Sequence, residues 1–376
     1  MAALPITTVF ADLPDPRRET ANKRHALTDI LVIAVCATIS GADGWEQMAE
    51  YGRRKKAFFD RFLSLANGVP SHDTFDRVFC ALDPDAFAAR FGRWMAAACE
   101  GSGLVPIALD GKAVRGAKRA NATGGLSVVS AWATAHRLTL GQVVVPDGTS
   151  EIAAIPDRLD TLDLAGAIVT IDAAGCQRAI AETIHQRYGY YLLAVKGNQP
   201  HLHAAVEGVF ERACEAEFVG VRHDTHVTIE DGHGRHEERS VTVVRNPDGL
   251  PPDWPGVRGV VQVCRERVVD GVRTSATHYD LTNAGGTAAE FAEWVRGHWG
   301  IENELHWVLD VAFREDASRT RDLNAGANLA MMRRVAVSLL KRATTKGSVQ
   351  TRRLMAAWDD DFLLQVLNGM PEAHSA

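Results

Sequence analysis

The chain has 376 residues, with 41 Lys and Arg against 47 Asp and Glu, and a formal net charge of −6. That length accommodates two or three domains, and a hydrophobic fraction of 46% is ordinary for a globular protein. The net negative charge argues against nucleic-acid binding, because proteins that bind nucleic acids usually carry an excess of basic residues. The longest apolar run, residues 30–39, is too short for a membrane span of about 20 residues. No secretory leader pattern is present, so we expect a cytoplasmic protein without a membrane partner.

Residues from about 26 to 100 carry the spacing of helices. Leu27, Ile30, Leu31 and Ala34 recur at steps of three and four, and Ser71 is placed to cap a helix that follows Pro70. The pattern predicts a helical N-terminal domain over 1–100. A DNA-binding helix-turn-helix and a plain helical packing unit both fit this spacing.

Five short β-rich runs follow, and a helix is expected at 177–187 between the last two. The runs are 104–109, 126–133, 139–145, 167–171 and 190–195. Three strands, a longer crossover and then strand–helix–strand predict an α/β fold with a mixed sheet flanked by helices. This is the order of a ribonuclease-H-like core, in which the first and fourth strands are neighbours.

A second β-rich region separates this core from the last helices. Asp231-Gly232 and Asp270-Gly271, each between strand-like runs, predict hairpin turns. Helical spacing returns around Glu302 and again over 325–341. We therefore expect a catalytic domain over 101–376, interrupted by a β-rich insert at about 200–285.

Three acidic residues point to the chemistry of the core. Asp110 ends the apolar run 104–109, Asp172 ends the run 167–171, and Glu302 lies in a helical stretch. A charge at the end of a buried strand costs several kcal/mol unless it is paired or bound to metal. Two strand-end aspartates and a helical glutamate are typical of a two-metal phosphoryl-transfer site, with Mg²⁺, or Mn²⁺ as a substitute, on carboxylate oxygens. We predict Asp110, Asp172 and Glu302 as catalytic and metal-binding residues.

The position on the helix favours Glu302 over Glu304 as the third acid of the site. Glu302 shares a largely apolar face with Phe291, Val295 and Leu305, whereas Glu304 projects elsewhere. On that face we expect Glu302 to point inward, either as a metal ligand or in a buried ion pair. His298 fits either the core or a contact to the cleaved strand, and Trp299 is expected in the core.

Basic side chains near these acids are candidate DNA contacts. Between residues 314 and 353 there are ten Lys or Arg against three acids, which offsets the acidic balance of the whole chain. Solvated helix faces would explain the same pattern. The predicted DNA-binding residues are Lys112, Lys196, Asn198, His298, Arg319, Arg321 and Arg333. A histidine-rich stretch between His223 and His236 lacks the spacing of a zinc site and fits a polar hairpin better.

The order of short motifs resembles bacterial insertion-sequence transposases of the DDE type, in the branch that includes the H-repeat-associated proteins found beside Rhs elements. The motifs are residues 13–18 (LPDPRR), 70–75 (PSHDTF), 108–112 (ALDGK), 170–173 (TIDA), 193–200 (LAVKGNQP), 233–239 (HGRHEER), 298–303 (HWGIEN) and 315–319 (EDASR). The resemblance implies that the three acids are the DDE triad on a ribonuclease-H-like fold. It further implies double-stranded DNA with terminal inverted repeats as the partner, and a homodimer in the DNA complex.

Two positions depart from that branch. Related transposases place Tyr, Arg and Lys where this chain has Val295, His298 and Leu309. The loop at 147–150 reads DGTS, where a Lys-Ser-Asn run is usual. From the resemblance as a whole, the expected function is a nucleoid-associated DNA transposase that cleaves and joins insertion-sequence ends. The alternatives are an inactive DNA-binding remnant and a metal-dependent nuclease that nicks without joining.

Overall fold

The structure is a computed structural model that describes residues 5–20, 23–101, 103–118, 125–146, 148–232 and 234–369. Asp147 and His233, which belong to two of the sequence motifs, lie outside these residues. The chain forms two compact units. The first comprises Met1–Ser102, Gly111–Ala154 and Ile301–Ala376, and the second comprises Gly103–Asp110 and Ile155–Gly300.

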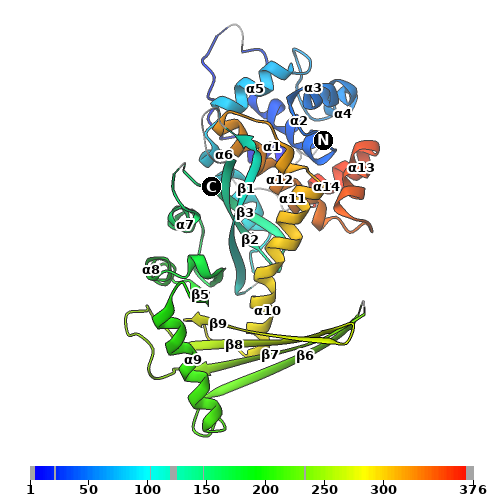
Figure 1. The fold of residues 1–376 in the computed structure, drawn as a ribbon. Helices are drawn as coiled ribbons and strands as arrows, with labels where there is room; N and C mark the ends of the chain where they lie inside the picture. The colour runs from blue at the N-terminus through cyan, green and yellow to red at the C-terminus, as the bar shows by residue number, and fades with distance from the viewer. Residues whose placement is uncertain are drawn as a thin grey trace. The chain divides into compact units, whose positions relative to one another are not determined.

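The first unit is built around two largely buried helices. Twelve of the thirteen residues of α2 (Leu27–Ile39) are buried, as its largely apolar sequence predicts, and α12 (Leu323–Arg342) is buried over most of its length. Helix α12 contacts α2 and α5 (Figure 1). The other helices of this unit are α1 (Pro5–Val9), α3 (Trp45–Arg54), α4 (Lys56–Phe59), α5 (His72–Ala81), α6 (Pro84–Ala97), α11 (Trp307–Val311), α13 (Val349–Trp358) and α14 (Asp360–Asn368). No helix in the described ranges is long and apolar enough to cross a membrane.

Three strands join these helices in the first unit, in the order β3-β2-β1. They are β1 (Val105–Lys118), β2 (Gly125–Ala133) and β3 (Leu138–Val144), and β2 pairs with β3 antiparallel. Helix α6 approaches β3 closely, because a Cβ added at Gly92 would lie 2.4 Å from the carbonyl oxygen of Leu140. Glycine is therefore required where this helix packs on the sheet.

The first six residues of β1 belong to the second unit, where the order is β1-β4-β5-β9-β8-β7-β6. Strands β4 (Ala167–Ile171) and β5 (Tyr190–Val195) run parallel to β1, and α8 (Arg178–Gln186) links them. With β2 between β1 and β3, an antiparallel β2–β3 pair and a parallel β1-β4-β5 set, the strand orders of the two units are those predicted for a ribonuclease-H-like core. The predicted fold class is confirmed.

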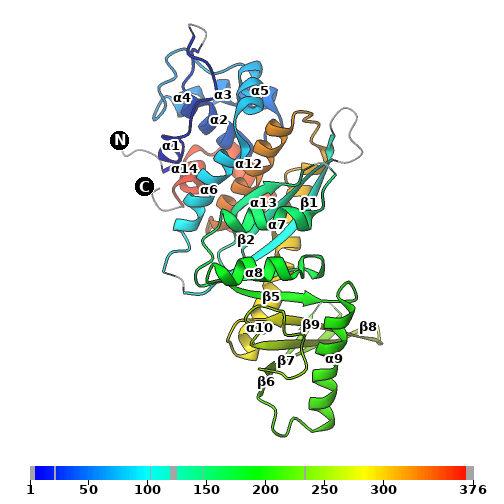
Figure 2. The ribbon, with the colours of Figure 1, turned by 90° about the vertical axis from the view of Figure 1, so that its left-hand side faces the viewer.

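The β-rich insert is an antiparallel sheet of four long strands. They are β6 (His223–Gly232), β7 (Arg235–Arg245), β8 (Gly259–Val269) and β9 (Val272–Thr282). Helices α9 (Pro200–Glu215) and α10 (Ala288–Gly300) lie on opposite sides of it (Figure 2). On the α10 side, valines of β7 and β8 pack with Phe291 and Trp294. On the α9 side, Phe210 stacks on Tyr279.

Several local predictions need correction. Strand β1 does not end before Asp110 but continues to Lys118. Helix α9 occupies the start of a region expected to be β-rich, and α7 (Glu151–Asp160) lies in a stretch expected to be only a crossover. Ser71 holds the N-cap position of α5, but its hydroxyl contacts the Thr74 hydroxyl at 3.1 Å and makes no capping hydrogen bond.

Candidate active site

Two of the three predicted acids lie at neighbouring positions in the second unit. Strands β1 and β4 are parallel, and their pairing ends at Leu109 opposite Ile171. Asp110 and Asp172 each follow directly, at the edge where β4 stops. The predicted juxtaposition of the two aspartates is thus supported by the register of the sheet. Asp110 is half-buried and Asp172 is exposed, so both carboxylates stand where a parallel sheet commonly binds ligands.

The turn after β4 holds Asp172 in place. Its Oδ1 accepts a hydrogen bond from the Gly175 backbone N–H at 3.2 Å. A Cβ at Gly175 would lie 2.2 Å from Ile171 Cγ2, so the tight turn requires glycine there. The Asn198 side-chain amide donates to the Ala173 carbonyl at 2.6 Å. Asn198 was predicted to bind DNA; in the structure its amide fastens the loop after β5 to the turn that carries Asp172.

Glu302 lies in a π-helical turn, Ile301–His306, in the first unit. A π-turn inside a helix is rare and frequently marks a functional site. A Glu302 carboxylate oxygen and a His306 ring nitrogen lie within 4.8 Å of each other, a separation that allows both to bind one ion. The expected inward position of Glu302 is wrong, since its side chain is exposed and His306 is buried. The wider π-turn breaks the α-helical spacing on which that expectation rested.

Glu304 is engaged elsewhere in the same unit. Its Oε2 lies 3.0 Å from Arg137 Nε and 3.1 Å from Lys341 Nζ. These two cations account for Glu304, so Glu302 is the better candidate ligand. Sequence reasoning missed His306, whose position four residues after Glu302 was the only available signal.

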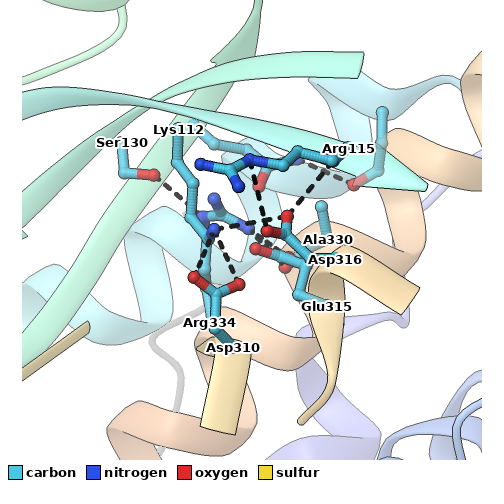
Figure 3. Close-up of polar contacts among 10 residues, drawn as sticks. Lys112, Arg115, Ser130, Asp310, Glu315, Asp316, Ala330 and Arg334 are labelled. Atoms are coloured by element: carbon cyan, nitrogen blue, oxygen red, sulfur yellow. Dashed lines mark hydrogen bonds and ion pairs between the residues drawn. The ribbon is translucent and has the colours of Figure 1, made fainter. Parts of the chain in front are cut away.

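Lys112 is buried and ion-paired rather than exposed to a ligand (Figure 3). Its Nζ lies 2.7 Å from Asp310 Oδ1 and 3.7 Å from Asp316 Oδ1. Because side chains alternate along a strand, Lys112 and Asp110 project from the same face of β1. The ion pair joins β1, two residues beyond Asp110, to α11.

Beside this pair lies a second, fully buried one (Figure 3). Arg334 Nη1 donates to Glu315 Oε1 at 2.9 Å, and both side chains have no exposed surface. Arg334 Nε also donates to the Ser130 hydroxyl at 2.8 Å, and Nη1 donates to the Ala330 carbonyl at 3.1 Å. These bonds connect α12, β2 and the segment after α11 within the first unit.

The remaining predicted DNA contacts differ in exposure. His298 Nδ1 is 3.1 Å from the Thr170 hydroxyl, which ties α10 to β4. Lys196, Arg319 and Arg321 are exposed, whereas Arg333 is only 2% exposed. Trp299 was expected in the core and is instead 53% exposed, because the helix presents its other face, with Phe291 and Trp294, to the sheet.

A buried acid of the insert sits near Lys196. Burial raises the pKa of Asp280 to about 7, and the positive charge of Lys196 partly opposes that rise. Burial, followed by the charges of Lys196 and Arg265, lowers the pKa of His278 to about 4. Burial shifts both pKa values toward the neutral form of each group, in keeping with their place on the α10 side of β9.

Comparison with known proteins agrees with this geometry. Residues 97–339 match the family model described as a transposase DDE domain, and residues 7–95 match the model described as DDE_Tnp_1-associated. The "H repeat-associated putative transposase YhhI" of Escherichia coli (strain K12) is 35% identical over 366 residues, 95% of this chain and 96% of that protein. The "Putative transposase YncI" of Escherichia coli O157:H7 is 36% identical over 372 residues, covering 96% and 93%.

One solved structure is similar at low identity. A chain of the "Cryo-EM structure of piggyBac transposase synaptic complex with hairpin DNA (SNHP)" matches 96% of this chain and 77% of its own length, at 8% identity and a TM-score of 0.42. The sequence comparisons are decisive by themselves, since one family model covers well over half of the chain and two relatives match nearly all of it. The chain belongs to the transposase family defined by the DDE domain.

Proposed function

We propose that this protein is a divalent-metal-dependent DNA transposase that cleaves and joins DNA at the ends of an insertion sequence. The observation that carries the proposal is the register of β1 and β4, which puts Asp110 and Asp172 at neighbouring positions. Two carboxylates at one edge of a rigid sheet are suitable anchors for hard divalent cations. No nucleophilic side chain is required, because the attacking oxygen comes from water or from a DNA 3′-hydroxyl.

Glu302 is proposed as the third ligand, with His306 beside it. The assignment is supported by the chain itself, because Lys112 lies only two residues after Asp110 in the sequence. Lys112 is ion-paired with Asp310, which lies two helical turns beyond Glu302. The occupation of Glu304 by Arg137 and Lys341 leaves Glu302 as the acid of this turn that is open to a ligand.

The donor set fits Mg²⁺ or Mn²⁺, which prefer oxygen ligands. When bound, two such ions supply activation of the attacking oxygen and stabilisation of the leaving oxygen. The protein itself fixes the positions of the ligand side chains. The Gly175 N–H orients the Asp172 carboxylate, the Asn198 amide secures that turn, and the Lys112 ion pair fixes β1 beyond Asp110.

Cleavage by this chemistry breaks the bond between phosphorus and the DNA 3′-oxygen and forms a bond from phosphorus to the oxygen of water. Joining forms a bond between the freed 3′-oxygen and a phosphorus of the target strand, displacing another 3′-oxygen. The substrate is double-stranded DNA carrying the terminal inverted repeats of the element. Two protomers would hold two such ends.

The test uses a plasmid that carries the gene's own flanking DNA, incubated with the protein and Mg²⁺ or Mn²⁺. Wild type is compared with Asp172→Asn and with the matched control Asp270→Asn, the same chemical change in the exposed turn between β8 and β9. Asp270 has φ 50°, a conformation that asparagine tolerates. We expect nicked, excised and joined products from wild type and the control, and none from Asp172→Asn.

Other outcomes would replace the proposal. Nicked plasmid without joined product would identify a nuclease that does not join DNA. DNA binding with no metal-dependent product from wild type would identify an inactive, DNA-binding member of the family. One short relative, matching 54 residues, carries the name "Inactive transposase YbfQ".

A further inference from the structure

The outer edge of the β-rich insert is an open strand. Strand β6 ends the sheet, and within the described chain its ten residues pair with β7 alone (Figure 1). Such an edge exposes a row of backbone N–H and C=O groups that can pair with another strand. Proteins commonly protect an edge with lysine, proline or a bulge, but β6 contains neither residue and pairs with β7 without a register shift. This edge is therefore suited to strand addition.

The acidic side chains of β6 do not protect the edge, because each has a partner within the same unit. Asp224 accepts a hydrogen bond at 2.7 Å from a backbone N–H at the start of α10. Glu230 is ion-paired with Arg296 of α10. Asp231 Oδ1 lies 2.7 Å from His236 Nδ1 on β7. Their charges are compensated from inside the unit, so a second strand would meet little repulsion.

Two apolar side chains lie exposed along the same edge. Val227 is 48% exposed and Ile229 is 60% exposed. Side chains alternate along a strand, and Asp224 and Glu230 contact α10, so Val227 and Ile229 lie on the opposite face of β6. Both are β-branched residues that suit a paired strand, and covering them would remove apolar surface from water.

A second copy of β6 complements this edge in one antiparallel register. In that register Thr228 lies opposite Thr228 of the second copy, on a twofold axis. Val227 then lies opposite Ile229, so the exposed apolar side chains cover one another on both sides of the axis. His226 lies opposite Glu230, and an imidazole N–H can donate to a carboxylate. Each of these favourable pairs occurs twice.

The neighbouring registers are less favourable. A shift of two residues in one direction places Asp224 opposite Glu230, which are like charges. The same shift in the other direction places Val227 opposite the charged Asp231. A shift of one residue would bring side chains from opposite faces of the two sheets together. We propose that β6 pairs with β6 of a second copy of this chain, centred on Thr228, to form a twofold-symmetric dimer.

The test measures self-association of the full chain without DNA or metal, so it is independent of the proposed activity. One strand from each copy buries less area than a standard interface of about 1,200–2,000 Å², so we expect a weak dimer whose fraction rises with protein concentration. Sedimentation velocity over a series of concentrations measures that fraction. His226→Glu places two carboxylates opposite each other at both ends of the pairing and should abolish the dimer.

A mixture of two variants tests the register. Glu230→Lys alone should also lose the dimer, because it removes the acceptor opposite His226. An equal mixture of His226→Glu and Glu230→Lys pairs opposite charges at one end and keeps the native pair at the other, so the dimer should return. His201→Glu, the same chemical change at an exposed position in α9, is the matched control and should dimerise as wild type does.

Amide hydrogen exchange gives a second measurement. Exchange within β6 should slow as the concentration of wild type rises and should not change with concentration in His226→Glu. A wild-type chain that stays monomeric at every concentration would overturn the proposal. A His226→Glu protein that dimerises as wild type does would also overturn it, and so would a mixture of the two variants that stays monomeric. Recovery of the dimer in the mixture would show in addition that both variant chains are folded.

Discussion

The buried pair of Glu315 and Arg334 gives the sharpest prediction about stability. The perturbation is Glu315→Gln, which keeps the shape of the side chain and removes its charge. In the folded protein Arg334 would then be a buried cation with neutral partners only. Because Arg334 cannot lose its proton, the charge remains and must be accommodated.

The size of the effect follows from the contacts. Both side chains are completely buried, and breaking such a pair on one side costs about 3–5 kcal/mol. Arg334 keeps its bonds to the Ser130 hydroxyl and the Ala330 carbonyl, which softens the loss. Glu315 Oε2 and Arg334 Nη2 make no hydrogen bond within the described chain, so the native pair is itself incompletely satisfied. We therefore expect the lower end, about 3 kcal/mol, a shift of more than a hundredfold in the folding equilibrium.

Urea denaturation followed by circular dichroism measures this difference. The matched control is Glu50→Gln, which removes an exposed ion pair with Arg53 and Arg54 and should change the stability little, because solvent screens such pairs. The double variant Glu315→Leu/Arg334→Met removes both charges and should recover much of the loss. A Glu315→Gln protein as stable as Glu50→Gln would refute the reasoning.

Three further predictions use neighbouring features. Gly116→Ala should destabilise the protein by about 1–3 kcal/mol in urea denaturation, because the new Cβ would lie 2.4 Å from a backbone carbonyl oxygen. Gly111→Ala is the comparison variant and should destabilise the protein less, because its Cβ would meet only the end of a flexible side chain. Lys112→Met should lower the melting temperature by calorimetry, because it leaves the Asp310 carboxylate unpaired, and an unchanged value would count against the ion pair. The pKa of Asp280 is about 7 in the folded protein, above its ordinary value of 3.8. The free energy of unfolding should therefore be highest below about pH 4 and fall as the pH rises to about 7. Asp280→Asn should remove this fall, as measured by urea denaturation at each pH.

The elements with strong local signals were predictable from the sequence. The Asp270-Gly271 turn has φ values of 50° and 77°, and the paired strands Gly259–Val269 and Val272–Thr282 flank it as expected for such a hairpin. The parallel neighbours β1 and β4 followed from the order of the runs. Helix α9 was missed because its first residue is a proline within a stretch of mixed polarity, and helix and strand patterns are hard to separate there.

The contacts of the site depended on distant residues and were not predictable. Lys112 reads as an exposed cation in the sequence, yet its partner Asp310 lies 198 residues away. Asn198 reads as a ligand-binding side chain after a strand, yet its amide bonds a turn 25 residues earlier. A sequence states which groups are charged or polar, but not which neighbour will neutralise them.

The π-turn at Ile301–His306 shows why the third acid was the hardest to place. An ideal helix assigns Glu302 to the apolar face with Phe291 and Leu305, both of which are buried as expected. The π-turn begins only at Ile301 and widens the spacing between Glu302 and Leu305, so these two residues do not share a face as they would in a regular helix; Glu302 is exposed and His306 is buried. Because the Glu302 carboxylate is exposed, its charge stays hydrated, and the buried ion pair that the apolar face of a regular helix would demand is not needed.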